Sequence, residues 1–301
     1  MDGILRVFTG EHSSFKFSVM GSDRLLEKAL VVTERALRCE ALVPLQTTLK
    51  MLLGNDDTMF ELRHLPGATP KHLRVAGPKP NPFRPWDQRL EVEQIGPDHV
   101  LILNKFPVQI GHMLLITRQW ASQSGWLNKN DWSALASVDR DTTGLWFFNS
   151  GPNAGASQPH RHFQLLPRSE GESNCPREHW FLNFNRDNAR ICFGPLRQAV
   201  RVQNLEEPIE DNLLCKTYLK LCEDLNLGSP DRDECPTAAY NLLLTRSWMA
   251  VIRRGREGVH GFSVNALGFA GCLLSTQSAD LTWLNESGPD ALLRAVILPK
   301  D

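Results

Sequence analysis

Three side chains that could act on a phosphorylated substrate lie within one short stretch, residues 149–164, which reads NSGPNAGASQPHRHFQ. His160, His162 and Gln164 alternate there, and apolar runs on both sides of the stretch predict strands. Because successive side chains of a strand point to opposite faces, we expect these three to project to the same side. An imidazole can attack phosphorus, while amide groups and the backbone N–H groups of a Gly-rich turn can bind phosphate oxygens. The stretch therefore predicts a phosphate-handling site.

The elements that must position this stretch read as short strands between separated helices. Apolar runs predict strands at 100–103, 112–117, 145–148, 162–166, 240–245 and 248–252, and a further strand pair within 262–274. Amphipathic patterns predict helices at 131–138, at 206–225 and at 22–39, the last capped by Ser22. The four prolines of 77–87 predict an irregular loop. The pattern indicates an α+β fold with a mainly antiparallel sheet and flanking helices.

The chain of 301 residues, 42% of them hydrophobic, is long enough for one large or two medium domains with a proper core. The run 168–176 is polar and rich in Gly and Ser, which predicts a junction there. We expect a catalytic N-terminal half, residues 1–170, packed against a C-terminal half, residues 171–301.

Charge, apolar run lengths and cysteine usage argue against a nucleic-acid-binding, membrane or secreted protein. The net charge is −1, from 33 basic and 34 acidic residues, which argues against an extended nucleic-acid or membrane-binding surface. No apolar run approaches the ~20 residues of a membrane helix, and the N-terminus does not resemble a secretory signal. Seven cysteines without a CxxC pair indicate free thiols. We therefore expect a reduced, cytoplasmic protein.

Two segments together resemble the histidine-triad superfamily. NKFPVQIGHMLLITR, residues 104–118, is similar to its N-x-x-P…G-H strand pair, and His162 follows Asn149 by thirteen positions, as in that superfamily. Within it, GASQPHRHFQ resembles the ATP adenylyltransferases, also called diadenosine tetraphosphate phosphorylases. NPFRPWD, YNLLLTRSWM and SVNALGFAG resemble the same family, so the likeness extends over about residues 22–275.

This resemblance implies a histidine-triad-like fold and a reaction in which diadenosine tetraphosphate and phosphate give ATP and ADP reversibly. It implies that His162 attacks the α-phosphorus, expels ATP and becomes adenylylated, after which phosphate takes the adenylyl group. A neutral imidazole is a good nucleophile near pH 7 because its ordinary pKa is about 6.5. The backbone carbonyl of His160 is the expected acceptor for the other ring N–H of His162.

The resemblance also implies the groups that bind the substrate. The N–H groups of Gly155, Ala156 and Ser157, together with the Ser157 hydroxyl, would hold the α-phosphate oxygens. Asn149 matches a substrate-positioning residue, and Gln164 would donate to a non-bridging oxygen. Further candidates for substrate contact are Asn104, Lys105 and Asn265.

Gln164 separates two subclasses of this superfamily. The triad hydrolases have a third histidine at this position, which can shuttle protons and help water to attack. An amide cannot titrate, so it can bind phosphate but cannot activate water. We therefore predict a transferase, in which the intermediate waits for a phosphorylated acceptor.

Each feature also has an ordinary structural interpretation. H-x-H on a strand can bind zinc, but a third ligand at suitable spacing is missing. His112 can be a core histidine, His160 a structural one, and Arg161 a surface ion-pair partner. Lysines and arginines that could bind remote phosphates, or could serve structure alone, are Lys50, Lys71, Lys79, Arg246, Arg253, Arg254 and Arg256.

Alternative functions stay open at this point. A hexose-1-phosphate uridylyltransferase shares the H-x-H-x-Q arrangement, a nucleotide sensor could use the same fold without catalysis, and a simple nucleotide hydrolase is disfavoured by Gln164. The expected partners are diadenosine polyphosphates, ATP, ADP and inorganic phosphate, with neither nucleic acid nor membrane. We expect Mg²⁺ to accompany the polyphosphate as the cofactor, because the sequence offers no dedicated acidic cage.

Overall fold

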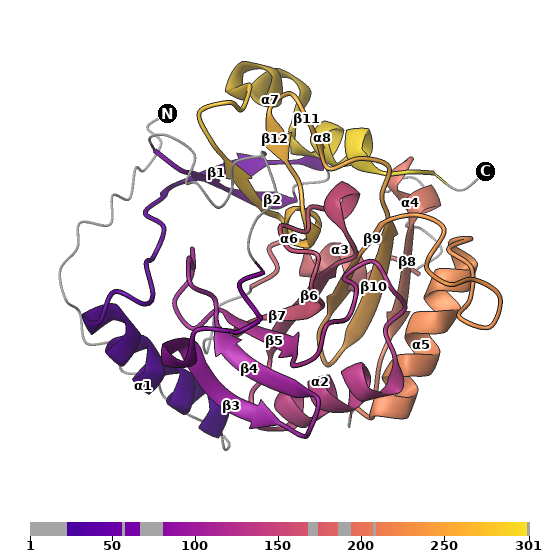
Figure 1. Cartoon of the computed structure of the whole chain (residues 1–301). Coiled ribbons are helices and arrows are strands. Elements are labelled where there is room, and N and C mark those ends of the chain that lie inside the picture. The colour runs from indigo at the N-terminus through magenta and orange to yellow at the C-terminus, as the bar shows by residue number, and fades with distance from the viewer. Residues whose placement is uncertain are drawn as a thin grey trace.

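The computed structural model describes residues 23–55, 58–66, 81–167, 174–185, 194–206 and 209–299 (Figure 1). Its centre is one antiparallel sheet of eight strands in the order β3-β4-β5-β7-β6-β9-β10-β8. The strands are β3 (Glu91–Ile95), β4 (His99–Leu103), β5 (Met113–Thr117), β6 (Gly144–Asn149), β7 (His162–Pro167), β8 (Val200–Asn204), β9 (Tyr240–Leu244) and β10 (Trp248–Arg253).

The pairing of β6 with β9 joins the two halves of the chain into this one sheet. The predicted α+β fold, its antiparallel sheet and the packing of the halves are confirmed. The predicted strands from 100 to 166 and from 240 to 252 are also confirmed, within one or two residues at each end. The predicted boundary between residues 170 and 171 lies outside the described residues and stays a prediction.

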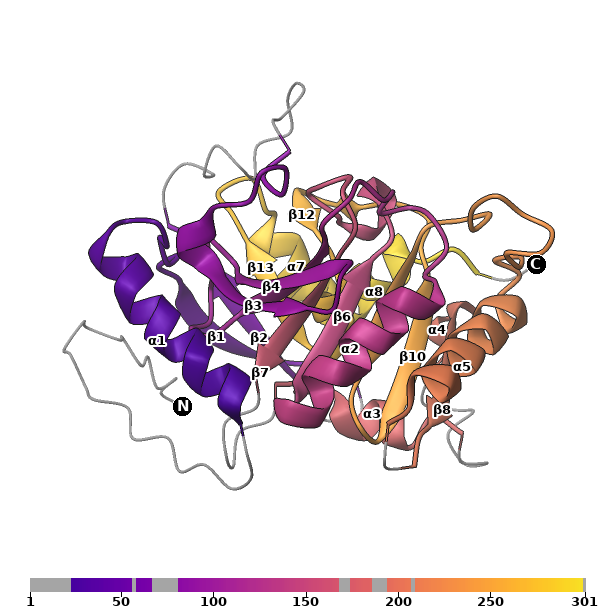
Figure 2. The ribbon, with the colours of Figure 1, turned by 60° about the horizontal axis from the view of Figure 1, so that its bottom comes forward.

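Three long helices cover one face of the main sheet, as Figure 2 shows. They are α1 (Arg24–Arg38), α2 (Lys129–Asp141) and α5 (Asp211–Asp224). Their apolar sides pack on the buried strand residues that point toward the helices, among them Trp146, Phe163 and Leu242. The three predicted helices are confirmed with shifted ends. The predicted cap of α1, Ser22, lies outside the described residues.

A second layer lies on the other face and draws on both halves of the chain (Figure 1). In it, β13 pairs in parallel with β2 and so joins the C-terminal half to an N-terminal hairpin. Its elements are β1 (Thr48–Leu53), β2 (Met59–His64), α3 (Glu178–Leu182), α4 (Leu196–Ala199), β11 (Gly258–Val259), β12 (Phe262–Ser263), α6 (Ala266–Ala270), β13 (Cys272–Ser275), α7 (Leu281–Ser287) and α8 (Pro289–Val296).

The prediction of a strand pair within 262–274 is confirmed in part: β12 and β13 are strands, but the short helix α6 separates them, and they pair with β11 and β2 instead of with each other. The side-chain oxygen of Asn265 accepts from the N–H of Leu267 and starts the helix. Gly271 ends it with φ at 102°, a conformation that favours glycine. The run SVNALGFAG therefore contains a helix, because it carries a helix start at Asn265 and a helix end at Gly271.

Among the described residues, no helix combines the length and the apolar character that crossing a bilayer requires. The six described cysteines are free thiols, as predicted. The predicted cytoplasmic location stays a prediction.

Candidate active site

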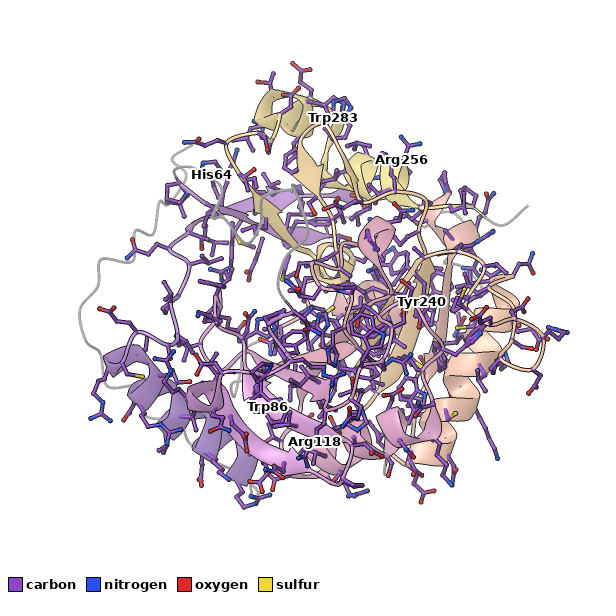
Figure 3. All side chains as sticks on the ribbon, in the orientation of Figure 1. His64, Trp86, Arg118, Tyr240, Arg256 and Trp283 are labelled. Carbon is purple, nitrogen blue, oxygen red and sulfur yellow. The ribbon has the colours of Figure 1, made fainter. Side chains whose placement is uncertain are left out.

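The predicted site residues lie on the face of the main sheet that the long helices leave free. On β7, Phe163 belongs to the helix-covered core, so His162 and Gln164 face the second layer. Phe147 of β6 pairs with Gln164, and where this pairing stops the side chain of Gln123 bridges the backbone of Asn149 to that of His162. Figure 3 shows the two layers, with His64 and Trp283 in the second layer and Trp86 and Arg118 beside the main sheet. The site therefore lies between the layers.

His162 has the geometry of a neutral nucleophile. Its ring is 4% exposed, and Nδ1 lies 2.7 Å from the carbonyl oxygen of His160. A carbonyl only accepts, so Nδ1 carries the proton and Nε2 keeps its lone pair. Burial lowers the pKa of His162 to about 4, partly offset by this hydrogen bond. The imidazole is therefore neutral at pH 7, and the predicted bond to His160 is confirmed.

Gln123, which the sequence did not single out, fixes the backbone around the nucleophile. Its side chain is 1% exposed, and its Oε1 accepts from the N–H of His162 at 2.8 Å. Its Nε2 donates to the carbonyl of Asn149 at 2.7 Å and to that of His162 at 3.3 Å. One buried amide thus joins the end of β6 to the start of β7.

His160 has both ring nitrogens occupied by structural contacts. Its Nε2–H donates to the carbonyl of Thr117 at 2.7 Å, and its Nδ1 accepts from the Asn81 amide at 2.9 Å. The Asn81 oxygen in turn accepts from the N–H of Phe83 at 3.0 Å, which fixes the orientation of that amide. Burial is the main cause of the lowered pKa of His160. The residue therefore contributes its carbonyl to the site, while β7 itself begins only at His162.

The loop that carries Asn81 also covers the nucleophile, a role that its proline-rich sequence did not reveal. The Phe83 ring lies 5.3 Å from the His162 ring and 5.6 Å from the His160 ring, centroid to centroid. Trp120, half exposed, stands edge-on to His160 at 5.5 Å from the other side. Aromatic rings thus exclude water from the histidine pair and account for its burial.

Gln164 is oriented by His112, which contacts the predicted site and is not only a core residue. The Nε2 of His112 lies 3.1 Å from Oε1 of Gln164, and its Nδ1 lies 3.1 Å from the Asn104 amide. Asn104 Oδ1 accepts from the N–H of Phe106, so its NH₂ group faces His112. His112 therefore carries its proton on Nε2 and donates to Gln164. Burial lowers the pKa of His112 to about 4, so it stays neutral at pH 7.

Asn149 is held by the C-terminal half. Its side-chain oxygen accepts from the Asn241 amide at 2.8 Å and from the N–H of Ala266 at 2.9 Å. The residue is 2% exposed, so these contacts are made in the interior. The sequence indicated Asn149 but gave no sign of these two partners, which lie more than ninety positions away.

The Gly-rich turn differs from the expectation of free N–H groups. The N–H of Gly155 donates to Pro152 at 2.8 Å and that of Ala156 donates to Gly151 at 3.0 Å, so both serve the turn itself. Ser157 is exposed and keeps its hydroxyl at the surface of the turn. A Cβ on Gly155, where φ is 83°, would lie 2.8 Å from the carbonyl oxygen of Val264. Glycine therefore lets the turn approach the C-terminal half closely.

The other residues that were predicted to contact the substrate have structural roles or lie at the protein surface. Asn104 orients His112, and Lys105 is exposed with its amine over the Phe106 ring. Asn265 caps α6 through its side-chain oxygen. Lys50 lies on β1 and donates to Asn285, whereas Lys71 and Lys79 lie outside the described residues.

The arginines of the second half also serve structure in large part. Arg246 pairs with Asp139, and Arg253 donates to the carbonyl of Pro299. Arg254 is buried under the Gly-rich turn, and Arg256 is exposed. Only Arg253 lies on a strand, and the four residues differ in partners and exposure, so they form no single phosphate cluster.

Arg161 was expected at the surface, and this expectation is wrong. Its side chain is 7% exposed, and its guanidinium lies 2.8 Å from the buried carboxylate of Asp131. His99 contacts the other oxygen of Asp131 at 3.0 Å, and Arg161 also donates to the carbonyl of Ser122. Because α2 covers this face, an arginine that points away from the catalytic histidines enters the protein interior.

Metal binding by the protein itself has little support. No group of three or more His, Cys, Asp or Glu side chains among the described residues is placed to hold a metal ion. The Nδ1 atom of His162 and both ring nitrogens of His160 are already bonded. The zinc alternative for the H-x-H pair therefore does not fit this geometry.

Comparison with known families agrees with this site. A model of the Ap4A phosphorylase N-terminal domain matches residues 16–181, and one of the ATP adenylyltransferase C-terminal domain matches residues 173–299. Protein APA1 of Saccharomyces cerevisiae is 29% identical over 245 residues, which cover 72% of this chain and 75% of the relative. The diadenosine tetraphosphate phosphorylase 2 of the same yeast is 28% identical over 235 residues, with coverage of 68% and 72%.

Solved structures of yeast Ap4A phosphorylase Apa2 share the fold. One aligns with a TM-score of 0.70 and 24% identity, covering 93% of this chain and 96% of that chain. The complexes of Apa2 with AMP and with Ap4A align with TM-scores of 0.72 and 0.70, each covering 99% of that chain. The N-terminal domain model, which matches more than half of the sequence, shows that the chain belongs to the Ap4A phosphorylase family.

Proposed function

We propose that this chain catalyses the reversible phosphorolysis of diadenosine tetraphosphate to ATP and ADP through an adenylyl group on His162. The observation that carries the proposal is the state of that imidazole. Its Nδ1–H donates to the carbonyl of His160 at 2.7 Å, and its pKa is lowered to about 4. A neutral ring with a fixed tautomer presents a free Nε2 lone pair at every pH at which the enzyme would work.

The reaction proceeds in two displacements at one phosphorus atom. Nε2 of His162 forms a bond to the α-phosphorus while the bond to the bridging oxygen breaks, and that oxygen leaves with ATP. An oxygen of inorganic phosphate then attacks the same phosphorus, the N–P bond breaks, and ADP leaves. The imidazole gains a positive charge when Nε2 bonds to phosphorus and loses it when the N–P bond breaks, so the ring is neutral again at the end of the cycle.

Two amides would stabilise the charge that develops on the α-phosphate oxygens. Gln164 has its oxygen occupied by His112, and Asn149 has its oxygen occupied by Asn241 and Ala266. In each side chain the NH₂ group is the part left to donate to substrate. Neither amide can take a proton from water, which supports phosphate as the acceptor of the adenylyl group.

A divalent cation such as Mg²⁺ would enter with the polyphosphate. The described residues offer no carboxylate or histidine cluster that could hold the ion alone. Oxygen-rich phosphate chains bind this cation themselves and lose part of their negative charge on doing so. The partners of the reaction would thus be diadenosine polyphosphates, ATP, ADP and phosphate, in line with the nucleotides present in the Apa2 complexes.

The test is product chromatography after incubation with diadenosine tetraphosphate and Mg²⁺, with and without phosphate. ATP and ADP that form only with phosphate are the expected result, whereas ATP and AMP without phosphate would mean a hydrolase. Intact-protein mass spectrometry without phosphate should show one added adenylyl group, and His162→Ala should lose both the adduct and turnover. His64→Ala, which changes a histidine of the second layer bonded to Ser275, serves as the control and should keep both. An adduct that persists in His162→Ala would overturn the assignment.

A further inference from the structure

Arg254 is a buried cation without a carboxylate partner at hydrogen-bond distance among the described residues. It is 1% exposed, and it follows the last residue of β10. Its donors go instead to oxygens of neutral groups, namely the carbonyls of Ala154, Val296, Arg256 and Glu257 and the side chain of Asn241. Burial of an unpaired charge costs free energy, so an arginine kept in this place calls for a function.

The contacts of Arg254 lead directly to the predicted site. Arg254 donates to Oδ1 of Asn241, whose Nδ2 donates to Oδ1 of Asn149 and to the carbonyl of Ala154, each at 2.8 Å. Asn241 and Asn149 are also cross-strand neighbours on β9 and β6. A chain of buried hydrogen bonds thus runs from the C-terminal half to both ends of the turn between Asn149 and Ala154.

The polarity of this chain is fixed at both ends. A guanidinium can only donate, so it must face the oxygen of Asn241, and the carbonyl of Ala154 can only accept from the Asn241 nitrogen. The backbone N–H of Ala266 can only donate, which independently places the oxygen of Asn149 on this side. The NH₂ group of Asn149 is therefore held on its other side, and Gln123 bridges the backbone of this residue to that of His162.

We propose, on the basis of the function proposed above, that Arg254 is a positioning residue that acts through Asn241 to hold the Asn149 amide with its NH₂ group toward the substrate phosphate. In this arrangement the C-terminal half sets the geometry of a donor that belongs to the N-terminal half. Without Arg254, only the Ala154 carbonyl and the Asn149 oxygen orient the Asn241 amide, which is then held less tightly; a rotated Asn241 would present its oxygen to the oxygen of Asn149. The donor for the α-phosphate would then be lost for part of the time.

The first test compares single-turnover rates and steady-state constants. Asn149→Ala should lower kcat about 100-fold, as expected for the loss of one transition-state donor. Arg254→Met, which keeps the length of the side chain but removes its donors, should lower kcat about tenfold with less change in KM. An unchanged kcat in Arg254→Met would overturn the proposal.

A double-mutant cycle separates positioning from general support of the fold. If Arg254 acts through Asn149, Arg254→Met in the Asn149→Ala background should lower kcat by less than twofold more. A further tenfold loss in that background would mean that the arginine acts by another route. All rates are measured well below the unfolding midpoint of each variant, so that a loss of stability alone does not appear as a loss of rate.

The control is Arg177, which is equally buried, pairs with Asp290 and donates to the carbonyl of Phe269 near the C-terminal end of α6, away from the N–H of Ala266 that holds Asn149. Arg177→Met should lose stability while kcat stays within about twofold of the wild type. Equal losses of kcat in both variants would overturn a specific role for Arg254.

Two further variants keep the proposal testable if Arg254→Met does not fold. Asn241→Asp retains a partner for Arg254 but cannot donate to Asn149, and it should lower kcat at least as much as Arg254→Met. Arg254→Lys can still donate to Asn241 and should recover part of the rate. Wild-type protein without any phosphorolysis would reject the proposed function itself, whereas an active wild type with a fully active Asn241→Asp would reject only the role of Arg254.

Discussion

Two hydrogen-bond relays approach His162 on the same face of the main sheet, one from the β5 side and the other, which begins in the C-terminal half, from the β9 side. The N-terminal relay runs from Asn104 through His112 to Gln164, and the C-terminal relay runs from Arg254 through Asn241 to Asn149. Both end in an amide whose oxygen is occupied, which leaves the NH₂ group for substrate. The first uses only neutral groups, whereas the second begins at a buried guanidinium.

Because one relay contains a histidine and the other an arginine, the two respond differently to pH. His112 can accept from Asn104 only while its Nδ1 is unprotonated, whereas its Nε2–H donates to Gln164 in either state. Its pKa of about 4 puts the loss of that state in acid solution. Burial also lowers the pKa of Arg254, to about 9, yet the guanidinium stays charged at every pH below that value. Acid therefore breaks the bond between Asn104 and His112 in the N-terminal relay and leaves the C-terminal relay intact.

The largest effect is expected from breaking the N-terminal relay at its centre. His112→Ala removes the donor that orients Gln164 and leaves the Asn104 amide without its acceptor, so kcat should fall about 10- to 100-fold. The loss should exceed that of Arg254→Met, because Asn149 keeps a second donor in Ala266. Steady-state kinetics check this order, with His64→Ala as the control. A smaller loss for His112→Ala than for Arg254→Met would reverse the ranking of the two relays.

A change at the end of the same relay should alter the acceptor as well as the rate. Gln164→His replaces a non-titrating amide by a group that can take a proton from water. We expect AMP formation without phosphate to rise about tenfold relative to wild type, while phosphorolysis falls. The products are separated by chromatography. Absence of any gain in hydrolysis would mean that residue 164 does not decide between water and phosphate.

The two relays also differ in how far the sequence could predict them. Asn104 and Gln164 were identified from their motifs, and His112 was noted, although as a core residue. These side chains lie on, or next to, three predicted strands that are neighbours in the sheet, so local sequence patterns are enough to place them on the correct face. The strands that carry them were predicted for the same reason, since short apolar runs bounded by turns are local signals.

The C-terminal relay could not be predicted in this way. Asn241 lies in an apolar strand without any sign of chemistry, and its contact with Asn149 spans 92 positions. Arg254 was considered as a phosphate ligand because basic residues cluster around it, but sequence does not show which of them enters the interior. The same limit explains Gln123 and Asn81, whose roles depend entirely on segments that fold back onto the histidines.

A further prediction uses the acid sensitivity of the histidines and concerns stability. His112 and His162 each have a pKa lowered from 6.5 to about 4, mainly by burial. Between these values the unfolded chain binds more protons than the folded one, so the free energy of unfolding rises with pH. Stability is fully present above pH 6.5 and is lost as the pH falls toward 4, by up to about 1.4 kcal/mol per pH unit for each histidine.

Urea unfolding at pH 7 and at pH 5 measures this dependence of the free energy of unfolding on pH. A variant at His112 measures how much of it comes from that histidine. His112→Gln removes one of the two titrating rings, so the difference between the two midpoints should shrink. An equal difference in the variant and the wild type would assign the acid sensitivity to other groups. Arg254→Met should leave the slope unchanged, because the guanidinium does not titrate in this range.

The smallest effect is expected at Asn265, which joins the C-terminal relay only indirectly. Asn265 caps α6, and the first N–H of α6, that of Ala266, is the second donor to Asn149. Asn265→Ala should lower the free energy of unfolding by about 1 kcal/mol, as the loss of a helix cap does, with KM unchanged. Denaturant unfolding and steady-state kinetics on the same preparation check both values. Asn265→Asp keeps the accepting oxygen and should restore stability, since Asp is an equally good cap. If KM instead rises severalfold in Asn265→Ala while stability is retained, Asn265 binds the nucleotide directly and is not primarily the cap that orders the end of the relay.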